Sequence, residues 1–244
     1  MGLLVAYGLV RWRIGRESRL AMAIAAVLPV AAILAWGAFP QPVADPTGAD
    51  CANPISPPAV WRFLEALVGL VTVTLLVVDR RAAWGELGLR IGSRRTLLIA
   101  VVGLLVVTPL ALFGGGLLGE QGIGGWFFGS YSLDLSQPAA LLPAALFAIS
   151  NALAEELAYR GSMRVWLGSS LGIVGANLAQ AIVFGLAHSG QDFVGPVAPT
   201  AAAMIAAGFA AGVIARRTNS LAVLLAIHAA ADIPLFFYWA CRIA

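Results

Sequence analysis

The chain has 244 residues, of which 60% are hydrophobic and only 11% are charged. Soluble domains carry about 25% charged residues, so this chain lacks the charge that a water-exposed surface requires. The composition predicts a polytopic membrane protein and excludes a soluble enzyme and a disordered chain. The formal net charge of +3 includes 15 basic residues. All are arginines, mostly in short clusters between apolar runs, as topology signals are, so no nucleic-acid partner is expected.

Seven apolar stretches are long enough for membrane-spanning helices, which need about 20 apolar residues each. They are 19–39, 59–78, 97–118, 139–167, 173–190, 197–215 and 219–240. Arginines lie in every second connection, so the positive-inside rule places the N-terminus in the cytoplasm and the C-terminus outside. The predicted fold is an all-α bundle of about seven spans. It forms one membrane domain, with N-terminal helices and loops over 1–138 and a second group of helices over 139–244.

Three further features of the sequence bear on its context. The absence of lysine fits a GC-rich coding bias and favours a bacterial protein of the inner membrane. Cys51 and Cys241 are isolated, so a disulfide is possible, but two such cysteines are more often unpaired. The run Met1–Val10 is apolar but too short to span, so it either lies in the interface or packs on the bundle.

Ionisable side chains inside spans are costly, so they mark candidate functional sites. In the fourth span, Glu156 and Arg160 are four residues apart and share a helix face. Glu155 is turned by about 100° and is expected to face a different neighbour. One carboxylate could therefore be neutralised within the helix while the other stays available for chemistry. Alternatively, all three residues form a buried ion-pair group that only stabilises the bundle.

The fifth and seventh spans carry the only two histidines. Phe184 and His188 share one helix face, although a lone histidine in a helix is more often a packing residue. His228 and Asp232 also share a face, and such a pair can bind a metal, orient a base or form a plain hydrogen bond. Counted from the predicted helix ends, Glu155 and both histidines lie roughly 14–20 Å from the inner face. These groups can therefore converge in one cavity, which we expect to open inward with lateral access from the lipid.

Three motifs in this region carry a family resemblance. Glu-Glu-x-x-x-Arg at 155–160, Phe-x-x-x-His at 184–188 and His-x-x-x-Asp at 228–232 resemble, in this order on membrane helices, the motifs of the CPBP family. This is the family of CAAX prenyl endopeptidases and bacteriocin-processing enzymes, also called the ABI family. The resemblance covers about 139–240. The stretch 85–90 is also similar to a loop that many members carry before the next span.

The resemblance implies an intramembrane endopeptidase of the glutamic type, in which Glu155 and His188 activate a water molecule. His228 and Asp232 would orient the site and stabilise the oxyanion. The third motif of the family often ends in Asn, and an ionised Asp232 cannot donate a hydrogen bond to an oxyanion. Asp232 would therefore act in its protonated form or only orient His228.

The remaining motif residues are expected to support the site. Arg160 would hold Glu156 and set the helix geometry, and Phe184 would pack beside them. No cofactor is expected, and no His-Glu-x-x-His zinc motif or evident serine or cysteine nucleophile is present. A divalent metal is the alternative. Its candidate ligands are Glu155, His188 and His228.

The expected partners are a peptide or membrane-protein substrate and the lipid bilayer. Two other functions are compatible with the motifs. A non-catalytic family member could serve as an immunity or scaffold protein on the same fold. A proton-coupled transporter could use the buried glutamates and histidines, but no internal repeat is visible, and this disfavours it.

Overall fold

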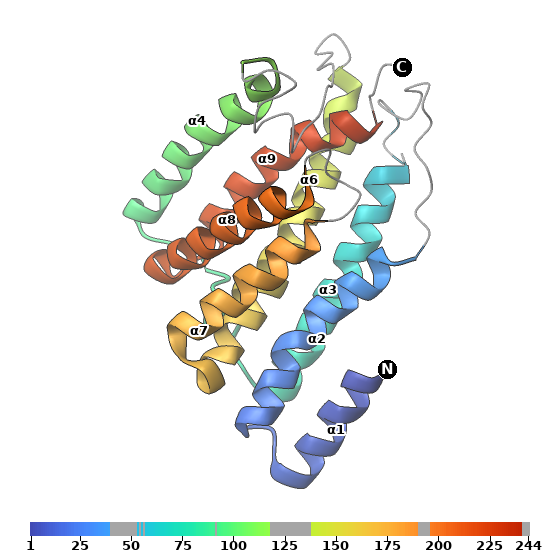
Figure 1. Cartoon of the computed structure of the whole chain (residues 1–244), viewed down its shortest axis with the longest axis vertical. Coiled ribbons are helices and arrows are strands. Elements are labelled where there is room, and N and C mark those ends of the chain that lie inside the picture. The colour runs from blue at the N-terminus through green and yellow to red at the C-terminus, as the bar shows by residue number, and fades with distance from the viewer. Residues whose placement is uncertain are drawn as a thin grey trace.

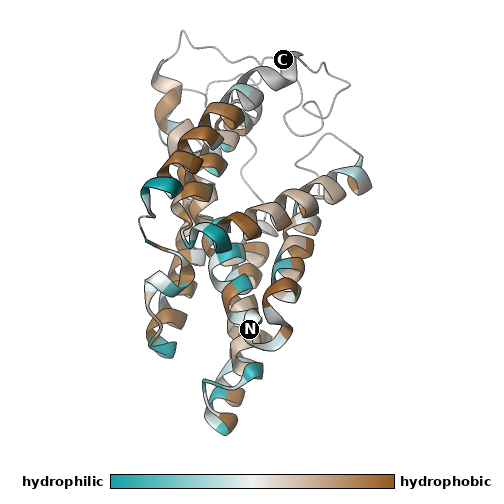
Figure 2. Ribbon diagram, turned by 90° about the vertical axis from the view of Figure 1, so that its left-hand side faces the viewer, coloured by the Kyte–Doolittle hydropathy of each residue, from teal (hydrophilic) through white to brown (hydrophobic). Residues whose placement is uncertain are grey.

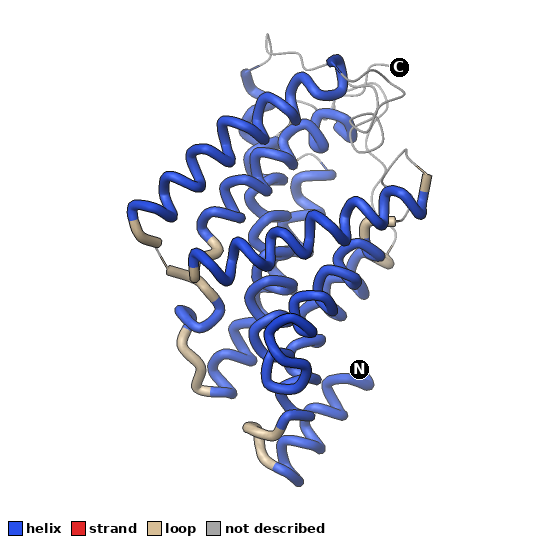
Figure 3. Tube along the Cα trace, turned by 60° about the vertical axis from the view of Figure 1, so that its left-hand side comes forward, coloured by secondary structure: helices blue, strands red, loops and turns tan. Residues whose placement is uncertain are grey.

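The structure is a computed structural model of the whole chain. It describes residues 1–39, 53, 55, 57–90, 92–117, 138–189 and 196–240. These residues form helices and connecting loops without a strand, packed as a bundle (Figures 1 and 3), which confirms the all-α prediction. The elements are α1 (Gly2–Ile14), α2 (Arg19–Gly37), α3 (Pro57–Arg80), η1 (Trp84–Leu87), α4 (Arg94–Leu117), η2 (Pro138–Ala140), α6 (Leu141–Glu155), η3 (Glu156–Met163), α7 (Arg164–Ala187), α8 (Val197–Thr218) and α9 (Ala222–Ala240).

The long helices are strongly apolar. Among the described residues, four stretches are long and apolar enough to cross a membrane, namely Arg19–Gly37, Pro57–Arg80, Leu141–Ala187 and Val197–Thr218. Figure 2 shows hydrophobic residues along these helices and hydrophilic residues at several of the helix ends. The chain is therefore an integral membrane protein. The seven spans, the cytoplasmic N-terminus and the division at residue 138 stay predictions.

The stretch Leu141–Ala187 is a helical hairpin. As one straight helix its 47 residues would measure about 70 Å, more than twice the hydrocarbon thickness of a bilayer. The direction changes at Gly172, whose φ of 71° and ψ of 172° favour glycine. Tyr159 and Phe184 stand nearly equally far from Gly172 along the chain, and their rings pack edge to face at 5.3 Å. The two arms therefore run antiparallel, and the predicted break between the fourth and fifth spans is confirmed.

The stretch 85–90 fixes the start of α9. Gly88 has a φ of 86°, and its carbonyl oxygen accepts a hydrogen bond of 2.8 Å from the backbone of Leu221. A Cβ atom on Gly88 would lie 3.2 Å from the Leu221 side chain, so the close approach favours glycine. Ser220 donates a hydrogen bond of 2.8 Å to the carbonyl of Arg90. This loop thus anchors the helix that carries the third motif.

Helix α1 packs on the bundle and also presents apolar residues outward. The buried Tyr7 donates a 2.6 Å hydrogen bond to Asp79 Oδ2 at the end of α3. Arg11 forms a 2.6 Å ion pair with Asp79 Oδ1, and the Arg16 side chain donates to the Asp79 carbonyl. Trp12 is 76% exposed. We call Tyr7, Arg11, Arg16 and Asp79 the α1 anchor.

Several arginines mark one end of the bundle. Arg80, at the end of α3, lies over the Trp166 ring at 5.3 Å and donates to the Arg16 carbonyl. Ser170 of α7 donates to the carbonyl of Arg19 at the start of α2. The end of α3 and the starts of α2 and α7 therefore meet, and we call this region the arginine end. Cys51 and Cys241, and with them the possible disulfide, lie outside the described residues.

Candidate active site

The first motif lies where the α-helix changes into a π-helix. Glu155 is the last residue of α6, and the next eight residues form η3 with i→i+5 hydrogen bonds. All eight residues of η3 are buried. Such segments are rare and frequently occur at functional sites. A regular helix was expected here, so the π-helix is a difference from the sequence prediction.

The three motifs converge on one carboxylate oxygen. Oε2 of Glu155 lies 3.6 Å from Nε2 of His188 and 3.5 Å from Nε2 of His228. Glu155 is only 8% exposed, and this oxygen accepts no hydrogen bond from the described residues. The predicted convergence of Glu155 and the two histidines from three helices is confirmed.

The partners of the histidines fix which ring nitrogen faces Glu155. Nδ1 of His188 lies 2.7 Å from the carbonyl oxygen of Phe184, and Nδ1 of His228 lies 2.8 Å from Oε1 of Glu156. A carbonyl and an ionised carboxylate only accept, so each Nδ1 carries a proton. In each neutral ring, Nε2 then has the lone pair and faces the carboxylate. Three acceptors that face one another require a proton or a water molecule between them.

Glu156 connects the first and third motifs. Its Oε1 accepts a 3.0 Å hydrogen bond from Nη1 of Arg160 as well as the bond from His228. Glu156 and Arg160 are each 2% exposed, so the predicted pairing is confirmed in a dry environment. Glu155 and Glu156 were expected to face different neighbours. Both reach His228, because its two ring nitrogens point in different directions.

Asp232 is held by a residue that we did not single out from the sequence. Its Oδ2 accepts a 2.9 Å hydrogen bond from Nδ2 of Asn151, and its Oδ1 lies 3.7 Å from Nε2 of His228. Asp232 and Asn151 are both buried. Asn151 stands four residues before Glu155 and therefore on the same helix face, which is the signal that could have revealed it.

The Phe184 ring forms the centre of the packing around the motifs. The guanidinium carbon of Arg160 lies 4.0 Å from its centroid, a favourable cation–π distance. The His188 ring lies 4.2 Å away, and Tyr159 packs edge-on. Phe184 therefore holds the second motif against the first, as expected for a supporting residue.

A second ion pair, between the half-buried Arg62 and the buried Glu65, faces the site from α3. Nη1 of Arg62 lies 2.5 Å from Oε2 of Glu65, and the guanidinium lies over the Phe147 ring at 5.6 Å. The charge of Arg62 acts on both Glu155 and Asp232. Sequence reasoning did not single out this pair. The signal was two opposite charges three residues apart inside a predicted span.

The fit of a divalent metal can be judged from the donors. Each histidine is bonded through Nδ1 to an acceptor, as metal-binding histidines are. Within the described part of the chain, however, no group of three or more His, Cys, Asp or Glu side chains is placed to hold an ion. A metal with Glu155, His188 and His228 as ligands stays the alternative, and we derive no step through one.

Comparison with known proteins agrees with the motifs. Residues 135–234 match the family model described as type II CAAX prenyl endopeptidase Rce1-like. The match extends from the residues before α6 into α9 and contains all three motifs. No curated protein and no solved structure matches the chain. The chain therefore carries an Rce1-like domain, and the family resemblance of its motifs is confirmed.

Proposed function

We propose that this Rce1-like chain is an intramembrane endopeptidase in which Glu155 and His188 activate the water that attacks a peptide bond. The observation that carries the proposal is the convergence of both histidine Nε2 atoms on Oε2 of Glu155, at 3.5 and 3.6 Å. The matched family is described as an endopeptidase, which supports protease activity.

The first step is attack by water. A water molecule between Glu155 and Nε2 of His188 donates one hydrogen bond to each acceptor. Its oxygen attacks the carbonyl carbon of the substrate while Oε2 of Glu155 takes a proton. The unpartnered state of this oxygen among the described residues supports its role as the base.

The second requirement is a donor for the oxyanion. In this proposal the proton that the three facing acceptors require lies on Nε2 of His228. The doubly protonated ring donates Nδ1–H to Glu156, and its Nε2–H, which faces Glu155, is the donor for the oxyanion that forms beside this carboxylate. Arg160 holds Glu156, and Asp232 sets the orientation of His228 from the adjacent turn. Asp232 thus acts as a positioning residue, itself held by Asn151.

The last step is collapse of the tetrahedral intermediate. The C–N bond breaks as the proton held by Glu155 passes to the leaving amine, so Glu155 is restored. The three motifs contain no lysine, serine or cysteine, the side chains that could form a covalent intermediate with the substrate.

The substrate in this proposal is a peptide or a membrane protein that reaches the site within the bilayer. The N-terminus lies in the cytoplasm, and the seven predicted helices span the bacterial inner membrane with the arginine end inside. We expect a cavity at the motifs that opens toward this inner face. The charge distribution between the apolar helices supports the orientation.

The test compares new protein N-termini in cells that carry the wild-type chain or Glu155→Gln at matched membrane levels. Glu17→Gln is the control, because it makes the same change at a side chain that is 76% exposed and far along the chain from the motifs. We expect a set of termini that vanishes in Glu155→Gln and persists in Glu17→Gln. If Glu155→Gln keeps every terminus and the full cellular activity, the protease proposal fails and a binding or immunity role is favoured.

A further inference from the structure

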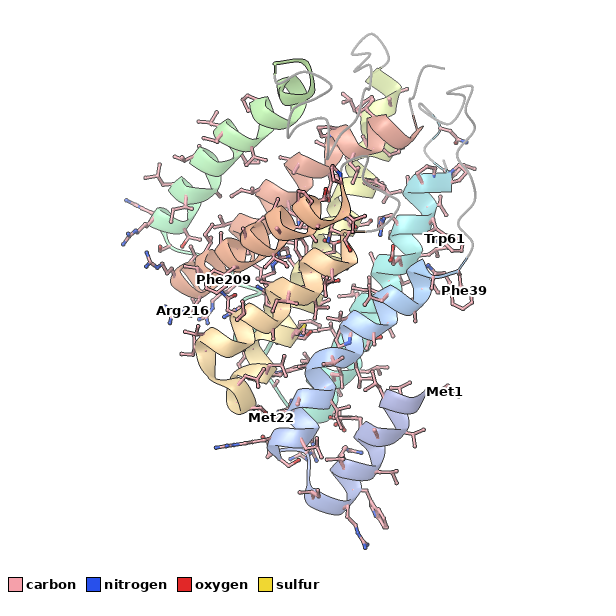
Figure 4. The ribbon with its side chains drawn as sticks, in the orientation of Figure 1. Met1, Met22, Phe39, Trp61, Phe209 and Arg216 are labelled. Carbon is pink, nitrogen blue, oxygen red and sulfur yellow. The ribbon has the colours of Figure 1, made fainter. Side chains whose placement is uncertain are left out.

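A small cavity between α7 and α8 lies away from the three motifs. Its volume is about 60 Å³, which by this measure is room for more than one water molecule. Arg164 of α7 and Arg216 of α8 line it, together with Asn177. Figure 4 labels Phe209 and Arg216 on α8, which runs beside α7. We call this cavity the Arg164–Arg216 pocket.

The two arginines bring positive charge that the described residues do not neutralise by pairing. Nε of Arg164 donates to the Arg160 carbonyl at 3.0 Å, but neither Arg164 nor Arg216 forms an ion pair with a described carboxylate. The charge of Glu156 acts on Arg164, but Glu156 is already bonded to Arg160 and His228. The charge of Arg216 acts unfavourably on Arg164. An anion between the two guanidinium groups would relieve this repulsion.

The walls of the pocket indicate what kind of anion fits. Ile173 is 59% exposed, Val174 is 71% exposed and Phe209 is 36% exposed, and all three line the pocket. In a membrane protein, exposed apolar side chains of this kind face lipid. The ligand should therefore combine an anionic group with an apolar chain.

The position of the pocket matches the depth of lipid headgroups. Arg164 begins α7 and Arg216 is in the last turn of α8. The start of α7 belongs to the arginine end, where Trp166 contacts Arg80. Basic pockets between membrane helices at such an end are suited to anionic headgroups.

The floor of the pocket is tightly constructed. Asn177 donates to the Phe209 carbonyl at 3.1 Å and accepts from Gln180 at 3.0 Å. A Cβ atom on Gly212 would lie 1.7 Å from Oδ1 of Asn177, so only glycine fits there. The buried Asn177 and Gln180 fix the separation of α7 and α8, and this separation keeps the pocket open between the two arginines.

We propose that the Arg164–Arg216 pocket binds the phosphate of an anionic membrane lipid, with an acyl chain along Ile173, Val174 and Phe209. The proposal does not depend on protease activity. Phosphate accepts paired hydrogen bonds from guanidinium groups, which favours arginine over a point charge. Binding would also stabilise the motif region, because Arg164 is bonded to the backbone of Arg160, and Arg160 holds Glu156.

The test uses the full-length protein purified in neutral detergent. Phosphatidylglycerol, phosphatidylcholine or inorganic phosphate is added, and the unfolding temperature and the lipid retained in native mass spectrometry are measured. Arg216→Gln is the main variant, since the Arg216 side chain makes no hydrogen bond with a described side chain that folding would lose. Arg217→Gln is the matched control, because Arg217 is the next residue, carries the same charge, is exposed as Arg216 is, and does not line the pocket.

We expect phosphatidylglycerol to stabilise and remain bound to the wild type and Arg217→Gln, with about fivefold weaker apparent affinity for Arg216→Gln. Phosphatidylcholine should give a smaller effect on all three proteins. Equal effects of phosphatidylglycerol on both variants would overturn the proposal. Stabilisation by inorganic phosphate equal to that by phosphatidylglycerol would show a site for a soluble anion and contradict the role of the acyl chain.

Discussion

Two polar clusters in this molecule are built from similar residues but differ in how their acceptors are used. In the α1 anchor, Asp79 has a partner for each carboxylate oxygen and for its carbonyl. The second cluster, which we call the motif cluster, consists of Glu155, Glu156, Arg160, His188, His228 and Asp232. Its buried Oε2 atoms of Glu155 and Glu156 accept no hydrogen bond from the described residues. Buried acceptors are normally satisfied, and exceptions call for an explanation. The comparison indicates that the α1 anchor is structural and that the motif cluster keeps acceptors for a ligand.

Arg160→Met should give the largest effect on stability and sharpen this comparison. It leaves the buried Glu156 without its cation, which we expect to cost about 3–5 kcal/mol in the free energy of unfolding. Arg11→Met is the matched change in the α1 anchor. Since Arg11 is 46% exposed, we expect it to cost less than about 1 kcal/mol. Denaturant unfolding in detergent measures both, and equal losses would show that the clusters do not differ.

Two substitutions of Asp232 distinguish its negative charge from its hydrogen bond with Asn151 at the third motif. In Asp232→Asn, the side-chain oxygen can still accept from Asn151 while the NH₂ group faces the site, so proteolysis should stay within about tenfold of wild type. Asp232→Ala leaves Asn151 without its acceptor and should lose about a further tenfold or more, since an unsatisfied buried group costs 1–3 kcal/mol. Cleavage rates on a substrate found by the N-terminus experiment measure this. If Asp232→Asn folds normally but cleaves no substrate, the negative charge of Asp232 itself is required.

Tyr7→Phe should break one contact of the α1 anchor and leave proteolysis unchanged. Loss of the hydrogen bond to Asp79 should cost about 1 kcal/mol. Burial, followed by the hydrogen bond to Asp79, raises the pKa of Tyr7 from 10.0 to about 12. A raised pKa stabilises the fold below pH 10, and this contribution is lost as the pH rises toward 12. The free energy of unfolding should therefore fall more steeply between pH 10 and pH 12 for wild type than for Tyr7→Phe. Parallel pH dependences would contradict the role of Tyr7 in the α1 anchor.

Metal removal should have the smallest effect. Because the described residues hold no group placed for an ion, dialysis against EDTA should leave cleavage by the purified protein unchanged. The α1 anchor gives no reason for metal dependence either, so stability should also be unchanged. A loss of cleavage that zinc restores would revive the metal alternative with Glu155, His188 and His228 as ligands.

The sequence was sufficient to predict contacts in the candidate site where helical spacing alone decides which side chains share a face. The proximity of Glu156 to Arg160, and of His228 to Asp232, follows from helical periodicity. The resemblance to the family motifs predicted that the two pairs belong to one site. The π-helix was not predictable, because no residue in Glu156–Met163 signals a wider turn. The sharing of His228 by two glutamates depends on how helices pack, which periodicity does not specify.

The same limit explains the other differences. Arg62 and Glu65 approach the motifs only because α3 packs beside α6, a contact between elements far apart in the sequence. The packing of Met1–Val10 on the bundle depends on a partner in α3, Asp79, whose position relative to Tyr7 is set by the tertiary fold. By contrast, the break near Gly172 was visible because a glycine lay between two long apolar stretches.

The turn at Gly172 has a consequence for how the site is assembled during synthesis. The first two motifs lie on the arms of one hairpin, so their contact closes locally and can form as soon as both arms are inserted. The third motif must join across 72 residues, the separation of Glu156 and His228. Helix α9 is the last described helix to leave the ribosome, so nascent chains hold Glu155 and His188 without His228. The protein therefore cannot complete its site until α9 has been synthesised and inserted.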